Sequence, residues 1–368
     1  MEIQENNMRI GILGGGQLAM MMIEMSSKNH EIDFLVVDPS ENPPASKFTR
    51  CIKSEYDDKD SLDILIKKCD VVTIDFENVP ASALRYVEKH IPVYPTASAV
   101  EICQDRLHEK NLFVKNKIKT TNYISIKSLE DLDKGMSKIG TNSILKSRKF
   151  GYDGKNQIVI NGKSAEDVWN LSGGTSSILE NKIDFITELS LIGVRTKSGE
   201  TFFYPLVENY HKNGILNTSI APYQDVKLQR DAEVIHNKIT KELNYVGVLV
   251  IEFFLDDTRQ LVANEMAPRV HNSGHWTISG ANLSQFEAHI LAISNMKIDP
   301  IEVKGNSAML NILSKMPSKK VIDENGPAHF YDYGKSERKN RKLGHLTLNN
   351  SNKTLLMDKV KKISKIIF

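Results

Sequence analysis

The stretch MRIGILGGGQLAMMMIEMSSKNHEIDFLVVD, residues 8–38, decides the fold class of the first part of the chain. Arg9–Leu13 is a short apolar run, Gln17–Met25 has helical apolar spacing, and Ile32–Val37 is a second apolar run. The pattern predicts a strand, a glycine turn, a helix and a second strand. Strands that alternate with helices at this spacing form parallel α/β sheets.

The same alternation continues beyond this stretch, but the pattern changes near Thr120. Residues 69–78 predict a third strand and Ala81–Lys89 a helix, so the α/β part runs to about Lys115. Further on, SILKSRKFGYDGKNQIVING (143–162) predicts two antiparallel strands joined by a glycine loop. We therefore expect a second part of α+β type, and a chain of 368 residues has room for two or three packed domains.

The composition is that of an ordinary globular protein and excludes several functional classes. Lys plus Arg total 48 against 46 Asp plus Glu, and a net charge of +2 gives no broad field for nucleic acid or an anionic membrane. The first residues do not have the pattern of a secretion signal, and no apolar run approaches the ~20 residues that span a bilayer. The three cysteines have no metal-type spacing. We expect a cytoplasmic protein that binds neither nucleic acid nor membrane.

The segment VLVIEFFLDDTRQLVANEMAP (248–268) carries the strongest chemical signal. It predicts a hairpin that turns at residues 257–258, and a symmetric turn places Glu252 opposite Ala263. Glu265 then projects from the same face as a diagonal neighbour, ~7–8 Å away at the backbone. Two carboxylates set in apolar strands are costly when unpaired, which favours a shared Mg²⁺ that carries a nucleotide polyphosphate over a solvated sheet face.

Two loops carry polar groups that suit anionic ligands. Lys146 leads into KFGYDGKNQ (149–157), where glycine amides suit nucleotide phosphates, although a plain hairpin turn explains that loop equally well. APRVHNSGHWT (267–277) follows Glu265 directly and places four donors around a Ser-Gly turn, which favours an anion-handling site over a structural turn. These donors are Arg269, His271, Asn272 and His275.

The glycine turn and a basic segment near the end of the chain are weaker signals. GILGGGQLA (11–19) opens a helix whose N–H groups and dipole favour a phosphate, but it lacks the G-x-G-x-x-G spacing and glycine also serves simple tight turns. Asp38 ends the next strand, where an NAD enzyme has a ribose-binding acid, so an NAD-linked oxidoreductase stays an alternative. YDYGKSERKNRKLGHLTL (331–348) is a glycine-interrupted run of basic residues, namely Lys335, Arg338, Lys339, Arg341 and Lys342.

Eight motifs, taken in order, give the chain a resemblance to a known family. It resembles the 5-(carboxyamino)imidazole ribonucleotide synthase family over nearly its whole length. The resemblance implies an ATP-grasp fold with a Rossmann-like domain at 1–115, an ATP-grasp domain at 116–300 whose small lid covers about 116–185, and a C-terminal subdomain at 301–368. The motifs are GILGGGQLA, TIDFENV, SRKFGYDGKNQ, ENKIDFITELS, YPLVENYHKNGIL, NEMAPRVHNSGHWTI, SQFEAHILAI and RKLGHLTL.

The resemblance also implies an activity. The family uses ATP and bicarbonate to carboxylate 5-aminoimidazole ribonucleotide in purine biosynthesis, through carboxyphosphate, and yields ADP and phosphate. It is typically dimeric, which implies a homodimer. Glu252 and Glu265 would bind Mg²⁺, in agreement with the hairpin argument, and Arg269, His271 and Lys342 would surround bicarbonate.

The same resemblance implies which residues bind the two larger substrates, the ribonucleotide and ATP. The phosphate of the ribonucleotide would lie between the glycine turn and the basic segment. Its ligands would be Gly15, Gly16, Gln17, Leu18, Glu77, Tyr152, Asp153, Lys335, Arg341 and Lys342. ATP would be held by Arg106, Lys146, Gly151, Tyr152, Asp153, Gly154, Lys155, Asn156, Gln157, Glu180, Asn181, Lys182, Ile183, Glu188, His211, Asn264 and Glu265.

The chain departs from the family pattern at a few positions. Asn156 stands where the family usually has glycine, and Met20-Met21 replaces an arginine-containing helix start. Asparagine tolerates positive φ, so we expect the loop to form. Three alternatives stay open besides the oxidoreductase: a non-catalytic nucleotide-binding regulator, another ATP-grasp carboxylase, and a formate-dependent glycinamide ribonucleotide transformylase.

Overall fold

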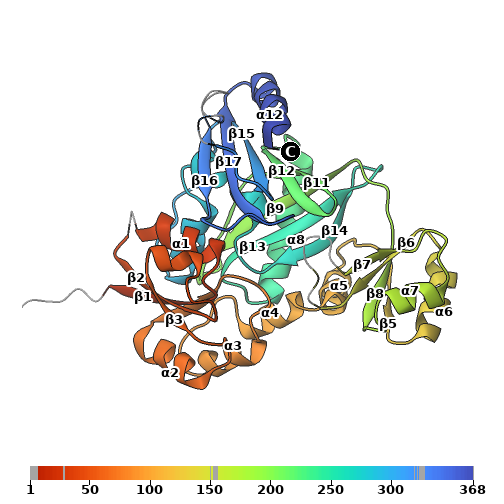
Figure 1. The fold of residues 1–368 in the computed structure, drawn as a ribbon, viewed down its shortest axis with the longest axis horizontal. Coiled ribbons are helices and arrows are strands. Elements are labelled where there is room, and N and C mark those ends of the chain that lie inside the picture. The colour runs from red at the N-terminus through yellow and green to blue at the C-terminus, as the bar shows by residue number, and fades with distance from the viewer. Residues whose placement is uncertain are drawn as a thin grey trace, which may run out of the picture.

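The computed structural model describes residues 7–27, 30–149, 151, 156–318, 320, 322 and 328–367. A central sheet joins three lobes (Figure 1): the N-terminal domain, the lid on the opposite side of the view, and the C-terminal segment, which extends the sheet at the top of the view. The described helices include none with the length and apolar character needed to cross a membrane.

The N-terminal domain is a four-stranded parallel sheet with the order β3-β2-β1-β4. Its elements are β1 (Met8–Leu13), α1 (Gln17–Ser27), β2 (Ile32–Asp38), a 3-10 turn (Pro44–Lys47), β3 (Arg50–Lys53), α2 (Lys59–Lys68), β4 (Val71–Ile74), α3 (Ala81–Glu88) and α4 (Ala97–Cys103). The predicted order of strand, glycine turn, helix and strand is confirmed. Met20, Met21 and Met22 are buried in a core that continues into the central sheet, so they serve packing.

The lid is a small antiparallel sheet with two helices, and α5 leads into it. Its elements are α5 (Arg106–Lys115), β5 (Tyr123–Ile126), α6 (Leu129–Ile139), β6 (Ser143–Ser147), β7 (Gln157–Val159), α7 (Ala165–Leu171) and β8 (Ser177–Asn181), and the strand order is β5-β8-β6-β7. The predicted pairing of β6 with β7 is confirmed. Leu145 and Leu179 pack against the helices, so by strand alternation Lys146 and Glu180 face the other side of the sheet.

The central sheet contains nine strands among the described residues, in the order β14-β13-β9-β11-β12-β15-β17-β16 with β10 beside β9. The strands are β9 (Thr187–Arg195), β10 (Thr201–Phe203), β11 (Val207–Lys212), β12 (Ile215–Ala221), β13 (Gly247–Leu255), β14 (Leu261–Ala267), β15 (Asn306–Leu313), β16 (His329–Asp332) and β17 (Lys342–Asn350). The helices are α8 (Val226–Glu242), a 3-10 turn (Asn272–Gly274), α9 (Thr277–Gly280), α10 (Gln285–Ile293) and α12 (Lys353–Ile367).

The segment beyond residue 300 extends this same sheet. β12 pairs with β15, and β15 pairs with β17, so the C-terminal segment shares a continuous hydrogen-bonded ladder with the ATP-grasp part. On the other side, α1 packs against α10 and buries the N-terminal domain against the sheet. The N-terminal domain and the C-terminal segment are therefore both anchored to the central sheet.

Candidate active site

The two hairpin glutamates face each other directly across β13 and β14. Glu252 pairs with Glu265, whereas Ala263 pairs with the residue after Glu252, so Asn264 is the extra residue of a β-bulge. The expected register, with Glu252 opposite Ala263, is wrong. The hairpin closes through a loop that ends at Arg259, where φ is 59°, and this loop together with the bulge shifts the pairing. Directly opposed residues lie about 4.5–5.5 Å apart at Cα, closer than the expected diagonal.

The two carboxylates differ in their tendency to ionise. Burial and the neighbouring Glu265 carboxylate raise the pKa of Glu252 to about 7. Burial acts on Glu265 in the same direction, but the Arg106 guanidinium, whose Nη1 donates to Glu265 Oε2 at 2.8 Å, lowers the pKa of that carboxyl. Asn264 Oδ1 lies buried on the bulge and has no hydrogen-bond partner within the described part of the chain. Two close carboxylates and a spare amide oxygen suit a hard cation.

These donors fit Mg²⁺. The ion takes oxygen ligands, and proteins usually supply only one or two carboxylates while waters and nucleotide phosphates fill the other positions. Within the residues that the structure describes, no group of three or more His, Cys, Asp or Glu side chains forms a closed metal cage. Glu252 and Glu265 would thus leave coordination positions to phosphate oxygens.

A buried charge cluster connects the lid with α5. Lys146 Nζ and Lys110 Nζ lie 3.2 and 3.4 Å from Glu180 Oε2, which also accepts a hydrogen bond from Thr121. Burial alone would raise the pKa of Glu180, but the two ammonium groups lower it to about 2. Glu180 therefore stays ionised and holds Lys146 of β6 and Lys110 of α5 at the face of the lid sheet opposite α6 and α7.

Two further buried residues of α5 belong to this cluster and were not predicted from the sequence. Arg106, Glu109 and Lys110 stand at positions i, i+3 and i+4, so they share one face of the helix. Glu109 Oε1 accepts from the Met266 backbone amide at 2.5 Å. Burial and the Glu265 carboxylate raise the pKa of Glu109 to about 8. The helical spacing was the available signal, but a charged face is usually a solvated one.

Glu188 and His211 form an ion pair on the same face of the central sheet as Glu252. Ser190 pairs with Glu252 and lies two residues from Glu188, so the three side chains project together. Burial acts to lower the pKa of His211, but the Glu188 and Glu252 carboxylates raise it above its ordinary value. The carboxylates around His211 therefore favour the protonated form of its imidazole.

Arg269 ties the N-terminal domain to the central sheet. It follows β14, and its Nε donates to Glu77 Oε2 at 2.5 Å, a contact between residues 192 positions apart. Burial acts to raise the pKa of Glu77, but the Arg269 guanidinium lowers it below its ordinary value. The pair brings a fixed cation from the loop after β14 to the carboxyl end of the parallel sheet.

His271 lies between this arginine and the glutamate pair. Its Nε2 is 3.4 Å from Glu252 Oε1, and its Nδ1 is hydrogen-bonded to Ser273 Oγ at 2.9 Å. Burial and the nearby charges of Arg269 and Lys342 hold the pKa of His271 well below its ordinary value. The imidazole is therefore neutral in this environment, in contrast to the cationic arginine and lysine beside it.

Two carboxylates accept hydrogen bonds from the backbone amides of the glycine turn. Gly15 N donates to Asp38 Oδ2, and Gly16 N and Ala19 N donate to the two oxygens of Asp75, at 2.7 Å in each case. We expected this turn to present open amides to a phosphate, and those of Gly15 and Gly16 are instead bonded within the protein. The same bonds argue against the oxidoreductase alternative, since a dinucleotide phosphate would need these amides and its ribose would need Asp38.

Residues of the basic segment lie at two parts of the site, the glycine turn and the glutamate pair. Lys335 contacts Gln17 of the glycine turn, and burial lowers the pKa of Lys335 to about 8 against the opposing charge of Asp75. The charge of Arg341 also acts on Lys335, so the two lie near each other. Lys342 begins β17, and its charge acts on Glu252. The segment therefore serves both the glycine turn and the glutamate pair.

The remaining predicted ligands belong to the lid and its loop. Asn156 has a φ of 57°, so it adopts the left-handed conformation expected at a glycine position, and Gln157 begins β7. Asn181 Oδ1 accepts from a backbone amide at 2.7 Å, whereas Lys182 is exposed and Ile183 half-buried. Four predicted ligands lie outside the described residues, namely Tyr152, Asp153, Gly154 and Lys155.

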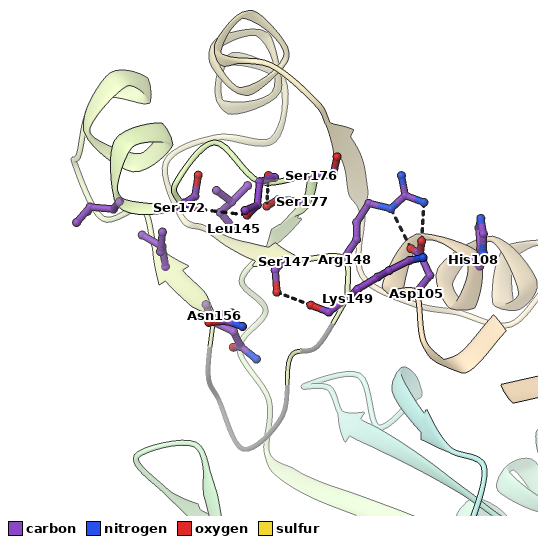
Figure 2. Close-up of a pocket in the computed structure, with 14 residues that line it drawn as sticks. Asp105, His108, Leu145, Ser147, Arg148, Lys149, Asn156, Ser172, Ser176 and Ser177 are labelled. Atoms are coloured by element: carbon purple, nitrogen blue, oxygen red, sulfur yellow. Dashed lines mark hydrogen bonds and ion pairs between the residues drawn. The ribbon is translucent and has the colours of Figure 1, made fainter. Parts of the chain in front are cut away.

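A cavity of about 700 Å³ lies between the lid and the start of α5, and Figure 2 shows the residues that line it. Leu145 and Ser147 line it, and they alternate with Lys146 along β6, so the cavity lies on the opposite face of the lid sheet from the charge cluster. At its edge Arg148 reaches Asp105 with two hydrogen bonds of 2.9 and 2.6 Å (Figure 2). We therefore place the active site at the glutamate pair and not in this cavity.

Comparisons with known proteins cover all three parts of the chain. Residues 7–104 match the ribonucleotide synthetase preATP-grasp domain, and residues 111–286 match the ATP-grasp domain. Residues 307–359 match the phosphoribosylaminoimidazole carboxylase C-terminal domain. The ATP-grasp match covers both the lid and the strands β9 to β14 of the central sheet.

Relatives and solved structures match over nearly the full length. The N5-carboxyaminoimidazole ribonucleotide synthase of Pseudomonas aeruginosa is 38% identical, with 98% of this chain and 99% of that protein covered. The N5-carboxyaminoimidazole ribonucleotide synthetase of Thermus thermophilus superposes with a TM-score of 0.92 at 38% identity, covering 97% and 98% of the two chains. The Aspergillus clavatus enzyme in complex with ADP and 5-aminoimidazole ribonucleotide has a TM-score of 0.88 at 26% identity, covering 98% and 99%. This chain belongs to the N5-carboxyaminoimidazole ribonucleotide synthase family of ATP-grasp enzymes.

Proposed function

We propose that this protein uses ATP and bicarbonate to carboxylate 5-aminoimidazole ribonucleotide, giving N5-carboxyaminoimidazole ribonucleotide, ADP and phosphate, in purine biosynthesis in the cytoplasm. The observation that carries the proposal is the meeting of Glu252, Glu265, Arg269 and His271 where the three lobes join, in a chain with synthase relatives over its full length. A relative with ADP and 5-aminoimidazole ribonucleotide bound supports the two larger ligands.

ATP would lie between the lid and the central sheet. Lys146 would face its phosphates from the lid, and Arg106 would face them from α5. Glu252 and Glu265 would hold Mg²⁺, with Asn264 Oδ1 beside them. Bound Mg²⁺ would offset the negative charge of the phosphates as a second anion approaches.

Bicarbonate would be activated among Arg269, His271 and Lys342. A bicarbonate oxygen would bond to the γ-phosphorus while the bond from that phosphorus to the β–γ bridging oxygen breaks, which gives carboxyphosphate and ADP. The amine of the ribonucleotide would then bond to the carboxyl carbon as phosphate leaves and the amine loses a proton. Bringing two anions together needs fixed positive charge, and Arg269 and Lys342 supply it without reorganisation.

The ribonucleotide would lie nearer the N-terminal domain. Lys335 and Arg341 would bind its phosphate beside Gln17, where the charge of the basic segment meets the glycine turn. The Arg269–Glu77 pair lies between that turn and the glutamate pair, so Glu77 would be close to the ribose or the amine. A homodimer, the assembly typical of the family, is part of this proposal, and light scattering of the purified chain tests it.

Incorporation of labelled bicarbonate tests the proposed reaction. With ATP and 5-aminoimidazole ribonucleotide present, ¹³C from bicarbonate should appear in the carbamate of the product, which is detected by NMR before it decomposes. Omitting ATP should abolish the signal. Incorporation of labelled formate into glycinamide ribonucleotide would instead assign the chain to the transformylase alternative.

A further inference from the structure

A chain of buried hydrogen bonds ends at the imidazole of His271. Ser219 Oγ donates to Asn209 Oδ1 at 2.7 Å, Asn209 Nδ2 donates to Ser190 Oγ at 2.9 Å, and Ser190 Oγ donates to Ser273 Oγ at 2.9 Å. Ser273 Oγ then lies 2.9 Å from His271 Nδ1. The three strands β9, β11 and β12 supply the first three residues, and all four residues that precede the histidine in this network are buried.

The last links of this chain fix which ring nitrogen carries the proton. The backbone amide of Ser273 donates to His271 Nδ1 at 3.3 Å, and an amide N–H has no capacity to accept. The Ser273 hydroxyl accepts from Ser190, so its own single proton is free to donate to the same nitrogen. Nδ1 thus faces two donors and is unprotonated, which leaves the ring proton on Nε2.

The Nε2 side of the ring faces the reaction site. Nε2 lies 3.4 Å from Glu252 Oε1. We infer that Ser273, Ser190 and Asn209 are positioning residues that hold His271 as the Nε2–H tautomer, so that His271 acts as a hydrogen-bond donor and not as a general base. This rests on the proposed function, in which His271 borders bicarbonate. An oxygen of bicarbonate or carboxyphosphate would accept that hydrogen bond, and no proton leaves the ring.

A purely structural role explains the chain less well. Burying polar side chains is costly unless each has a partner, and an apolar core would pack these strands without that cost. His289, another buried histidine, shows the structural pattern: its Nδ1 accepts from Val248 N at 3.0 Å and its Nε2 contacts Thr73 Oγ1 at 2.8 Å, so both nitrogens are bonded inside the core. His271 uses its Nδ1 in the same way but presents its Nε2 to a carboxylate of the site.

Nitrogen NMR of the full chain labelled with ¹⁵N-histidine tests the tautomer directly. The His271 signals are assigned by their loss in His271→Asn. We expect Nδ1 to have the shift of an unprotonated ring nitrogen and Nε2 to couple to its proton, with His289 as an internal reference for an Nδ1 acceptor. A proton on His271 Nδ1 in the wild-type protein would overturn the inference, whether or not any variant folds.

Kinetics of Ser273→Ala and Ser190→Ala test the consequence for turnover. Removing one neutral hydrogen bond should lower kcat about 3- to 10-fold and leave the KM values for ATP and ribonucleotide within about twofold. Ser273→Thr, which keeps the hydroxyl, should restore kcat, and Ser26→Ala is the matched control because the buried Ser26 hydroxyl has no partner among the described residues. Unchanged kcat in Ser273→Ala together with a mixed tautomer would refute the role. If the wild type shows the expected tautomer but no ribonucleotide-dependent turnover, the proposed function fails and the tautomer assignment stands.

Discussion

At the scale of single residues, the site depends on an opposed pair of glutamates whose charges differ. Arg106 keeps Glu265 ionised, while burial and Glu265 raise the pKa of Glu252 to about 7. The two carboxylates repel each other unless both bind the same cation. The first prediction follows from this repulsion.

Glu265→Gln should lower kcat by about 100-fold or more, because it removes a charge aimed at the cation that offsets the transition-state phosphates. The melting temperature should fall only modestly, since the amide has the same shape and the lost attraction to Arg106 is partly offset by relief of the repulsion with Glu252 and Glu109. Turnover and thermal unfolding are measured together. Glu166→Gln, at an exposed position on α7, is the matched control. Turnover near that of the wild type would refute the metal-binding role of the hairpin.

Lys335 should give the ribonucleotide step a pH dependence. Because the pKa of Lys335 is lowered to about 8, the ammonium group that would meet the phosphate is lost as the pH rises through 8. A phosphate monoester has its second pKa at ≈ 6, so its charge is constant in this range. The value of kcat/KM for ribonucleotide, which reports the free enzyme, should fall about tenfold per pH unit above 8. Lys335→Arg should flatten the pH profile of kcat/KM for ribonucleotide between pH 7 and 9.5. If the variant shows the same fall as the wild type, the fall is caused by another titrating group.

Arg341 and Lys342 are neighbours in sequence that should differ in kinetic effect. Arg341 lies near Lys335, so Arg341→Ala should weaken ribonucleotide binding by about tenfold or more through the loss of ~1.5–3 kcal/mol. Lys342 acts on Glu252, so Lys342→Ala should lower kcat far more than it raises the KM for ribonucleotide. The affinity for ATP should be unchanged in both variants. Calorimetric titration of each variant with ATP and with ribonucleotide measures the two affinities. A selective loss of ATP binding would show that the basic segment binds ATP and not the ribonucleotide.

At the scale of elements, local pattern predicted the strands of the hairpin but not their register. The apolar runs around Glu252 and Glu265 are clear in the sequence, and both residues were found as a pair. The bulge at Asn264 leaves no such signal, because any residue adopts it once the flanking strands are paired.

Another element-level feature is the anchor between the lid and α5. Arg148 donates twice to Asp105, and its carbonyl accepts from the Arg106 amide at 2.9 Å, so it fixes the residue that pairs with Glu265. Arg148→Ala should raise the KM for ATP roughly tenfold, because charge-assisted bonds are worth ~1.5–3 kcal/mol. The KM for ribonucleotide should stay the same. Lys163→Ala, an exposed lid position, is the control. A change in the ribonucleotide KM alone would contradict this coupling.

At the scale of the whole molecule, the sequence predicted the parts better than their assembly. The α/β start, the α+β remainder and the motifs of the site follow from local spacing and resemblance. The continuous sheet from β14 to β16 does not, because pairing such as β12 with β15 joins residues far apart in the chain. The Arg269–Glu77 contact and the carboxylates at the glycine turn likewise depend on tertiary packing, which no local window contains.

Phosphate release from ATP by the purified chain tests the proposed reaction as a whole. The purified chain is assayed with ATP and Mg²⁺ alone, with 5-aminoimidazole ribonucleotide added, with bicarbonate added, and with both. Rapid release is expected only when ribonucleotide and bicarbonate are both present, because the proposed reaction consumes all three substrates together. Release stimulated instead by glycinamide ribonucleotide and formate, or release indifferent to the ribonucleotide, would contradict it.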